Sequence, residues 1–508
     1  MEQSRTKNTI RNISAGLVGK VVGLVLPFII RTIIIYRMGT DYAGLNSLFS
    51  SILQVLSAAE LGFSSAIIFS LYKPVAENNE DEICQWLSLY RRIYLIVGTV
   101  ILVAGCLVMP FLRFLIKGDY PADINLYLLY GIYLFGSVIS YFVVGYKNVI
   151  LTVYQRQDIL SNIDLGVNIT RSIIQVAVLM LCKNYYLYII WNPIFTLVTN
   201  FLVDFITKRK YPNLVCTTKI PRDKFKKISK QIKGVALGKF SLLARNAFDS
   251  IILSALLGLT TVAMYSNYYF VFTSVGAILI VLLQAMSASV GNSIATETRE
   301  KNLLDHHKFD FYFSWITSWA TICMACLYQP FMKLWVGEDL VFPYHTMILF
   351  CVYFYINQLS QVRSIYSEAA GLWWDFRYVT IGEMLTNLTL NIVLGLWLGV
   401  DGILLATIIS ALVSSYLFLT QITFKKFFHA SPKKYYQNTT FYMIVTIFAG
   451  IISILACSLV LVDGFGGLLL RLGVCIILPN AIFLLVYCCF KEYRTYCLGI
   501  VHLIRQKK

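Results

Sequence analysis

The chain has too few charged residues to cover the surfaces of several water-soluble domains. Asp, Glu, Lys and Arg together make up 14% of its 508 residues, whereas 58% of the residues are hydrophobic. A soluble chain of this length would fold into several domains with polar exteriors. The composition excludes that arrangement and indicates a protein embedded in a membrane.

Acidic residues are the scarcer of the two charged classes. The chain has 26 Asp and Glu against 43 Lys and Arg, which gives a net charge of +17. A strong positive charge can indicate a nucleic-acid-binding protein. Here the basic residues stand in short polar segments between apolar runs, as is typical of membrane proteins. We therefore expect no nucleic-acid partner.

The chain also lacks the residue patterns of an enzyme. Its five histidines lie mostly in polar segments, and we find no nucleophile–base set and no nucleotide-binding glycine loop. Cys323 and Cys326 have CxxC spacing, but no second pair or histidine in the sequence completes a zinc site. We interpret these cysteines as helix-packing residues, and we expect no catalysis, no cofactor and no metal.

Long apolar runs dominate the sequence instead. Each has about the 20 residues that cross a hydrocarbon core roughly 30 Å thick, or more. They lie at residues 13–36, 44–72, 93–116, 124–146, 164–182, 185–206, 234–258, 262–291, 309–333, 341–368, 378–398, 401–424, 439–461 and 467–490. The sequence predicts an all-α integral membrane protein with about 14 transmembrane helices.

Lysine and arginine are concentrated in alternate loops, with about 31 on one side and about 3 on the other. The positive-inside rule then places both termini in the cytoplasm. The longest basic loop, 207–233, is expected to anchor the topology at anionic headgroups, with a partner site as the alternative. It separates an N-terminal lobe (1–206) from a C-terminal lobe (234–424), and residues 425–508 add a terminal pair of spans and a tail.

A faint internal repeat relates the two six-span halves. AGLVGKVVGLVL (Ala15–Leu26) is similar to GVALGKFSLLAR (Gly234–Arg245), and the connection at Met38–Phe49 is similar to that at Leu257–Phe270. In both connections a glycine turn precedes a helix start rich in small residues. Two halves related by an axis normal to the membrane would enclose a central cavity.

Several cationic side chains fall inside the apolar runs. A cation near the bilayer centre costs roughly 2.5 kcal/mol or more, so it must snorkel, pair or face water. Lys20 and Arg31 are eleven residues apart and therefore lie on nearly the same helix face. Since guanidinium binds phosphate oxygens bidentately, a pyrophosphate is a suitable cargo group. The candidates for a cationic, substrate-binding cavity are Lys20, Arg31, Arg171, Lys239, Arg245 and Arg363.

Fewer acidic side chains than cationic ones fall clearly inside the apolar runs. Glu60 is expected to pair with a cation of the first span, and the alternative is that it carries a coupling proton. Asp249 is four residues from Arg245, within reach of a helical ion pair. Even with such pairs, cations remain in excess.

At these residues the sequence resembles a known family. RTIIIYRMGTDYAGLNSLFSSILQVLSAAELGFSSAIIFSLYKPVAENNEDEI (Arg31–Ile83) and LGVDGILLATIISAL (Leu398–Leu412) resemble the polysaccharide-transporter branch of the multidrug/oligosaccharidyl-lipid/polysaccharide exporter (MOP) superfamily. The first motif is fairly specific for Wzx-type flippases of O-antigen and capsule units, whereas the second occurs across the superfamily. The resemblance covers essentially the whole chain.

The resemblance implies two six-helix lobes around a central cationic cavity, with alternating access and an accessory C-terminal helix pair. The implied cargo is an undecaprenyl-pyrophosphate-linked oligosaccharide, carried to the outer leaflet of a bacterial inner membrane. Implied partners are this lipid-linked oligosaccharide, membrane lipids, a polysaccharide polymerase and glycosyltransferases.

Two other functions are weighed against the flippase. A drug or cation exporter of the same fold predicts a cavity dominated by carboxylates, whereas cations dominate here. A membrane polysaccharide polymerase would need a large outer loop for its catalytic residues, and every outer loop that we predict is short.

Overall fold

The computed structural model describes residues 22–57, 60–214, 240–241, 243, 245 and 247–497. Within these residues the regular secondary structure is helical and contains no strand. This result confirms the all-α prediction.

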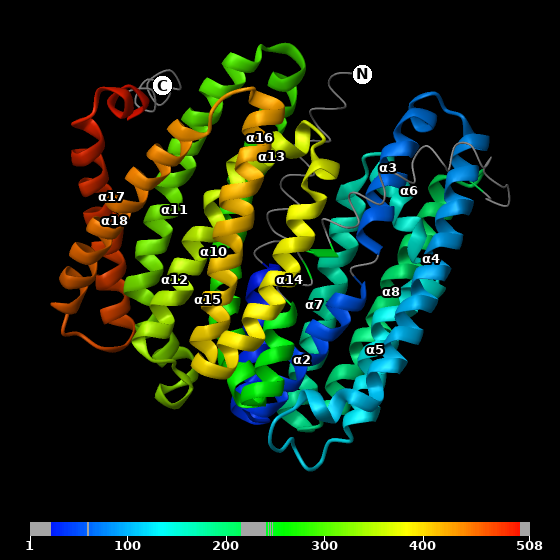
Figure 1. The fold of residues 1–508 in the computed structure, drawn as a ribbon. Helices are drawn as coiled ribbons and strands as arrows, with labels where there is room; N and C mark the ends of the chain where they lie inside the picture. Colours follow the sequence, from blue (N-terminus) through cyan, green and yellow to red (C-terminus); the bar gives the residue numbers. More distant parts are fainter. Residues whose placement is uncertain are drawn as a thin grey trace. The chain divides into compact units, whose positions relative to one another are not determined.

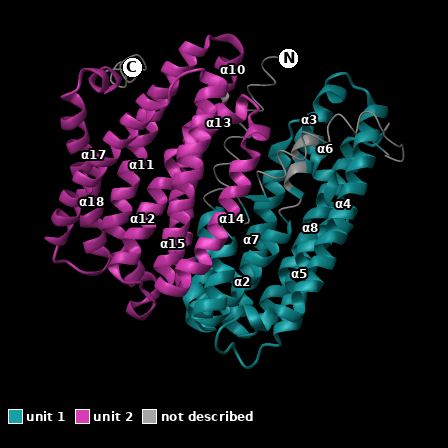
Figure 2. Ribbon diagram, in the orientation of Figure 1, with its two compact units in different colours: residues 1–263 teal, residues 264–508 magenta. Residues whose placement is uncertain are grey.

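The chain folds into two compact units, Met1–Ala263 and Met264–Lys508 (Figure 2). The division falls within a single helix, α10 (Leu259–Thr296). The four-part division made from the sequence, with its lobe boundary at the basic loop, stays a prediction.

The helices of unit 1 pack mainly against their neighbours: α4 on α5, α5 on α8 and α7 on α8 (Figure 1). Residues 22–37 are helical and precede them, and a helix at Ala247–Leu257 and the first turn of α10 complete the unit. The bounds are α2 (Thr40–Ser57), α3 (Leu61–Ala76), α4 (Glu80–Val108), η2 (Met109–Leu115), α5 (Leu126–Phe142), η3 (Gly145–Lys147), α6 (Asn148–Val153), α7 (Gln157–Leu181) and α8 (Tyr185–Lys210).

Unit 2 contains the rest of α10 and the helices that follow. Helix α11 packs against α12, α17 and α18, and α14 packs against α15. Two of its segments, η5 and η6, are π-helical. The bounds are α11 (Arg299–Val336), η4 (Glu338–Leu340), α12 (Tyr344–Leu359), α13 (Gln361–Ala369), α14 (Trp373–Leu398), α15 (Val400–Ser410), η5 (Ala411–Leu419), α16 (Thr420–Thr423), η6 (Phe424–Phe428), α17 (Lys433–Ser458) and α18 (Gly464–Cys488).

Many of these helices are long and apolar enough to cross a bilayer. In the described part of the chain 8 helices meet this test. The number is 9 if α5 and the segment Gly145–Val153, which is bent by 56° relative to α5, form one span. Large apolar side chains such as Leu181, Trp397 and Leu461 are 80–89% exposed, which suits contact with lipid rather than water. The chain is a multi-pass membrane protein, and the total of 14 spans stays a prediction.

Equivalent glycines begin α2 and α10. Gly39 has φ +117° and Gly258 has φ +89°, a backbone conformation that favours glycine. The two glycines correspond in the alignment of Met38–Phe49 with Leu257–Phe270. Both connections of the repeat therefore enter their helices through a glycine with positive φ.

The starts of these two helices meet in unit 1. A Cβ atom on Gly44 of α2 would lie 2.3 Å from the carbonyl oxygen of Leu259, the first residue of α10. The hydroxyl of Thr260 donates a hydrogen bond to Asp41 across the same contact, at 2.7 Å. Only a glycine at position 44 leaves room for the backbone of α10.

Replacing Gly44 with alanine should lower the melting temperature of the detergent-solubilised protein. Overpacking of this kind costs about 1–3 kcal/mol, because the added methyl must displace backbone rather than a flexible side chain. The matched control is Gly166→Ala in α7, where a Cβ would meet nothing within 4 Å. Equal melting temperatures for the two variants would contradict the close approach of α2 to α10.

Candidate functional site

A cavity of about 370 Å³ lies among α2, α5 and α8 in unit 1. This volume is within the range of small-molecule sites. Its wall is a mixture of hydroxyl, amide and apolar groups, contributed by Asn46, Ser50, Leu53, Gln54, Ser57, Ile132, Tyr133, Gly136, Ser137, Ile189, Asn192 and Pro193. Such a wall offers neutral hydrogen-bonding partners beside apolar contact surface.

Hydrogen bonds tie this wall to the neighbouring helices. The hydroxyl of Tyr133 donates to Asn46 Oδ1 at 2.6 Å and lies 3.1 Å from the hydroxyl of Tyr185. On the other side, Gln175 Nε2 of α7 donates to Asn192 Oδ1 at 2.9 Å. These bonds fix the rotamers of polar groups that would otherwise be costly to enclose.

Two of the predicted cations interact electrostatically with the same tyrosine, Tyr188. Arg31 donates from Nη2 to the carbonyl oxygen of Ala263 at 3.2 Å, and its charge acts on the hydroxyls of Tyr185 and Tyr188. Arg171 donates from Nη2 to Asn168 Oδ1 at 2.6 Å, and its charge also acts on Tyr188. The charges of Arg31 and Arg171 therefore act on one tyrosine of α8, which is one of the three helices that line the cavity.

The carboxylate of Glu60 is held by hydroxyl groups. Tyr141 of α5 donates a short hydrogen bond to it, and Ser64 donates another at 3.4 Å. Tyr94 of α4 lies beside Tyr141, with ring centroids 4.9 Å apart, and its hydroxyl also bonds to Glu60. Lys20 lies outside the described residues, so the ion pair of Glu60 with the first span stays a prediction.

The second group of predicted cations lies at the helix before α10. Arg245 is 6% exposed and Asp249 is 1% exposed, so both side chains are buried. Lys239 lies outside the described residues. The proposed pairing of Arg245 with Asp249 stays a prediction.

Arg363 belongs to unit 2. Its side chain, on α13, is 1% exposed, and it donates from Nη2 to Ser415 Oγ at 3.4 Å. The guanidinium carbon lies 5.7 Å from the ring centroid of Phe376, and Glu383 of α14 adds an electrostatic interaction. Arg363 is therefore enclosed by its own group of partners, and it belongs to a different unit from Arg31, Arg171 and Arg245.

With these positions established, the chain can be compared with known proteins. No protein-family model and no curated protein matches it. Among solved structures, the lipid II flippase MurJ in an inward closed conformation has a TM-score of 0.69 at 15% identity, covering 94% of this chain and 99% of that chain. The fold is that of MOP-superfamily transporters.

Two further structures support this assignment. An inward-facing multidrug resistance MATE transporter of the MOP superfamily has a TM-score of 0.59 at 15% identity, covering 78% of this chain and 92% of its own. A MOP-superfamily transporter from Pyrococcus furiosus has a TM-score of 0.54 at 14% identity, covering 84% and 97%. The superfamily fold expected from the sequence is confirmed, whereas the Wzx-type branch stays a prediction.

Within the MOP-superfamily fold, unit 2 contains a buried polar stripe that the sequence analysis missed. It runs along α11 at intervals of four residues, and each member is at most 7% exposed: Asn302, His306, Asp310, Ser314 and Ser318. His306 and His307 fall in the polar segment 292–308, between two of the apolar runs predicted from the sequence. Helix α11 instead begins at Arg299, where the side chain of Thr298 accepts a hydrogen bond from the backbone N–H of Lys301 at 3.3 Å. The four-residue spacing of polar side chains was the available signal.

His306 of this stripe and its neighbour His307 are buried, and their surroundings favour the uncharged form of both rings. His306 is 0% exposed and is surrounded by the rings of Tyr366, Phe424, Phe428 and Tyr435, at centroid distances of 5.2–5.6 Å. Burial lowers the pKa of His306 well below its ordinary value, and electrostatic interactions with His307 and Arg363 lower it further. For His307, burial and then Lys434 lower the pKa to about 4, against a smaller opposing effect of Glu492.

The stability of the protein should consequently fall as the pH drops from about 6.5 towards 4. In this window His307 takes up a proton in the unfolded chain but not in the folded one, so its contribution is complete above about pH 6.5 and is lost below. For each pH unit in which only the unfolded chain binds this proton, the free energy of unfolding falls by up to about 1.4 kcal/mol. Thermal melting between pH 7 and pH 5 should show a smaller loss for His307→Asn than for the wild type.

The exposed His429 supplies the control for this measurement. It has φ +51°, a conformation that asparagine tolerates, so His429→Asn should keep the wild-type pH dependence. If His307→Asn and the wild type lost stability equally, His307 would not be the neutral, buried group that its surroundings require.

Proposed function

We propose that this chain is a flippase that carries an undecaprenyl-pyrophosphate-linked oligosaccharide repeat unit from the cytoplasmic to the outer leaflet of a bacterial inner membrane. The product would serve the synthesis of O-antigen or capsule. The observation that carries the proposal is that the charges of Arg31 and Arg171 both act on Tyr188 of α8, a helix that also contributes to a cavity lined by neutral polar and apolar groups.

The chemistry of this arrangement suits a pyrophosphate-linked sugar. Guanidinium groups bind phosphate oxygens through two parallel hydrogen bonds, which a compact ammonium group does not match. The amides and hydroxyls of Asn46, Gln54 and Asn192 are the kind of groups that bond to sugar hydroxyls. The prenyl tail needs no polar site and would remain in the lipid.

The transport cycle that we propose is alternating access between two lobes around a central cavity, with both termini in the cytoplasm. Lys20, Lys239, Arg245 and Arg363 are proposed as further cationic groups along the path. Glu60, held by tyrosine and serine hydroxyls, is proposed to form an ion pair with the first span or to carry a coupling proton. A polysaccharide polymerase and glycosyltransferases are proposed as partners, and membrane lipids as the surroundings.

A drug or cation exporter is the second candidate, and the MATE transporters of similar fold favour it. Such an exporter would be expected to bind its cationic cargo through carboxylates of the chain. The carboxylate of Glu60 is occupied by Tyr141 and Ser64, whereas the charged groups that act on Tyr188 of α8 are guanidiniums. This difference in charge supports the flippase over the exporter.

Replacing Arg31 or Arg171 with alanine should reduce polysaccharide export by about tenfold to a hundredfold, since each charge-assisted hydrogen bond to a phosphate is worth roughly 1.5–3 kcal/mol. Lysine at either position should retain part of the activity, because it keeps the charge but loses the paired hydrogen bonds. Export is measured as surface polysaccharide in cells that depend on this chain, with membrane levels quantified in parallel.

Arg92→Ala, at an exposed site on α4, is the matched control and should export normally. Purified protein in proteoliposomes separates the two candidate functions: a fluorescent pyrophosphate-linked glycolipid should cross, and cationic dyes should not. Full export by both alanine variants, or transport of the dyes alone, would refute the flippase.

A further inference from the structure

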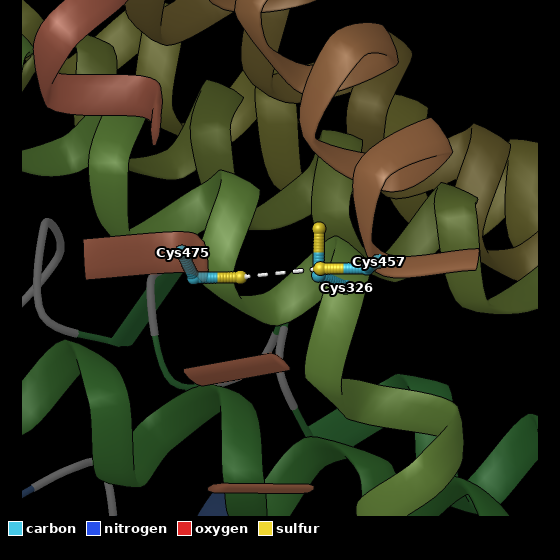
Figure 3. Close-up of side chains that lie close together, drawn as sticks. All are labelled: Cys326, Cys457 and Cys475. Atoms are coloured by element: carbon cyan, nitrogen blue, oxygen red, sulfur yellow. Dashed lines mark hydrogen bonds between the residues drawn. The ribbon is translucent and has the colours of Figure 1, made fainter. Parts of the chain in front are cut away.

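Three cysteines from three helices meet inside unit 2. Cys326 comes from α11, Cys457 from α17 and Cys475 from α18, and their three sulfur atoms all lie within 4.8 Å of one another. The Sγ atoms of Cys457 and Cys475 are 3.9 Å apart (Figure 3). We call these three residues the thiol cluster.

The spacing of the thiol cluster suits a metal ion more closely than a disulfide. Thiolate sulfur lies about 2.3 Å from a bound metal, so three sulfurs around one ion are separated by about 4 Å. A disulfide needs sulfurs only about 2 Å apart. The Sγ atoms of Cys457 and Cys475 are 3.9 Å apart, which is close to the distance expected for two thiolates bound to one ion.

The surroundings of the thiol cluster select the kind of ion. Cys475 is 0% exposed, Cys457 5% and Cys326 7%, and apolar residues including Ile322, Ala449 and Phe483 belong to the same core. The ligand set consists of sulfur alone, which favours soft ions such as Cu(I) or zinc. Structural zinc takes four ligands, whereas the thiol cluster supplies three, so its geometry favours Cu(I).

A positive side chain stands next to the thiol cluster. Arg471 lies one helical turn before Cys475 on α18 and donates to the carbonyl oxygens of Val460, at 2.8 Å, and Cys457, at 3.4 Å. Its charge also acts on the Cys457 thiol. Because metal binding leaves negatively charged thiolates in an apolar core, a fixed guanidinium here would offset part of that charge.

We propose that the thiol cluster binds a single cuprous ion and thereby joins the accessory helices α17 and α18 to α11. This proposal does not depend on the cargo of the transporter. It revises the interpretation of Cys326 as a packing residue, because the ligands missing from the CxxC sequence come from two helices near the far end of the chain. Cys323, one turn before Cys326, lies at the edge, with its Sγ atom 4.0 Å from the carbonyl oxygen of Cys475.

The test is an anaerobic titration of the full-length, detergent-solubilised protein with Cu(I) in competition with a chromophoric Cu(I) chelator. One equivalent should be retained by the wild type, and X-ray absorption should report three sulfur neighbours at about 2.3 Å. Cys475→Ala should weaken this binding at least a hundredfold. Cys84→Ala, which removes a buried cysteine from unit 1, should leave it unchanged.

Thermal melting keeps the test informative if one variant folds poorly. Added Cu(I) should raise the melting temperature of the wild type and of Cys84→Ala, because a ligand of the folded state stabilises it, but not that of Cys326→Ala or Cys475→Ala. Equal Cu(I) affinity in the wild type and Cys475→Ala would overturn the proposal. So would binding of zinc in preference to Cu(I), with four sulfur ligands.

Discussion

Charged and polar side chains inside apolar helices must find their partners within the protein, because lipid supplies none. This constraint explains the local structure around each buried charge described above. The carboxylate of Glu60 draws hydroxyl donors from α4 and α5, Arg31 reaches a backbone carbonyl at the start of α10, and Arg363 rests on an aromatic ring. At these points the polar partners therefore constrain how the helices are rotated, in addition to apolar packing.

The fold class could be predicted from the sequence because apolar length is a direct requirement of the bilayer. Each of the fourteen predicted runs coincides, at least in part, with helix in the described residues. The breaks within runs could not be predicted. The run at 44–72 contains the end of α2 at Ser57 and the start of α3 at Leu61, and the run at 341–368 contains the end of α12 at Leu359. Hydropathy is insensitive to such breaks, since both sides of the break are equally apolar.

The candidate site was predictable only as a set of residues, not as a geometry. Arg31 and Arg171 stand out as cations within apolar runs, but their electrostatic interaction with Tyr188 depends on how α7, α8 and the first helix are rotated. The thiol cluster could not be predicted for the same reason, because Cys326 lies beside cysteines from helices that are distant in the sequence. The buried stripe of α11 differs from both, because its four-residue spacing is visible in the sequence and depends on one helix alone.

The hydrogen bond between Arg31 and helix α10 has a mechanical consequence within unit 1. The 38 residues of α10 run without interruption from Leu259, in unit 1, to Thr296, in unit 2, and Arg31 is bonded to the carbonyl of Ala263 at the point where one unit passes into the other. A displacement of the helix at residues 22–37 relative to the start of α10 must therefore break this hydrogen bond within unit 1. The guanidinium of Arg31 thus fastens the first described helix to the backbone of α10 at the last residue of unit 1.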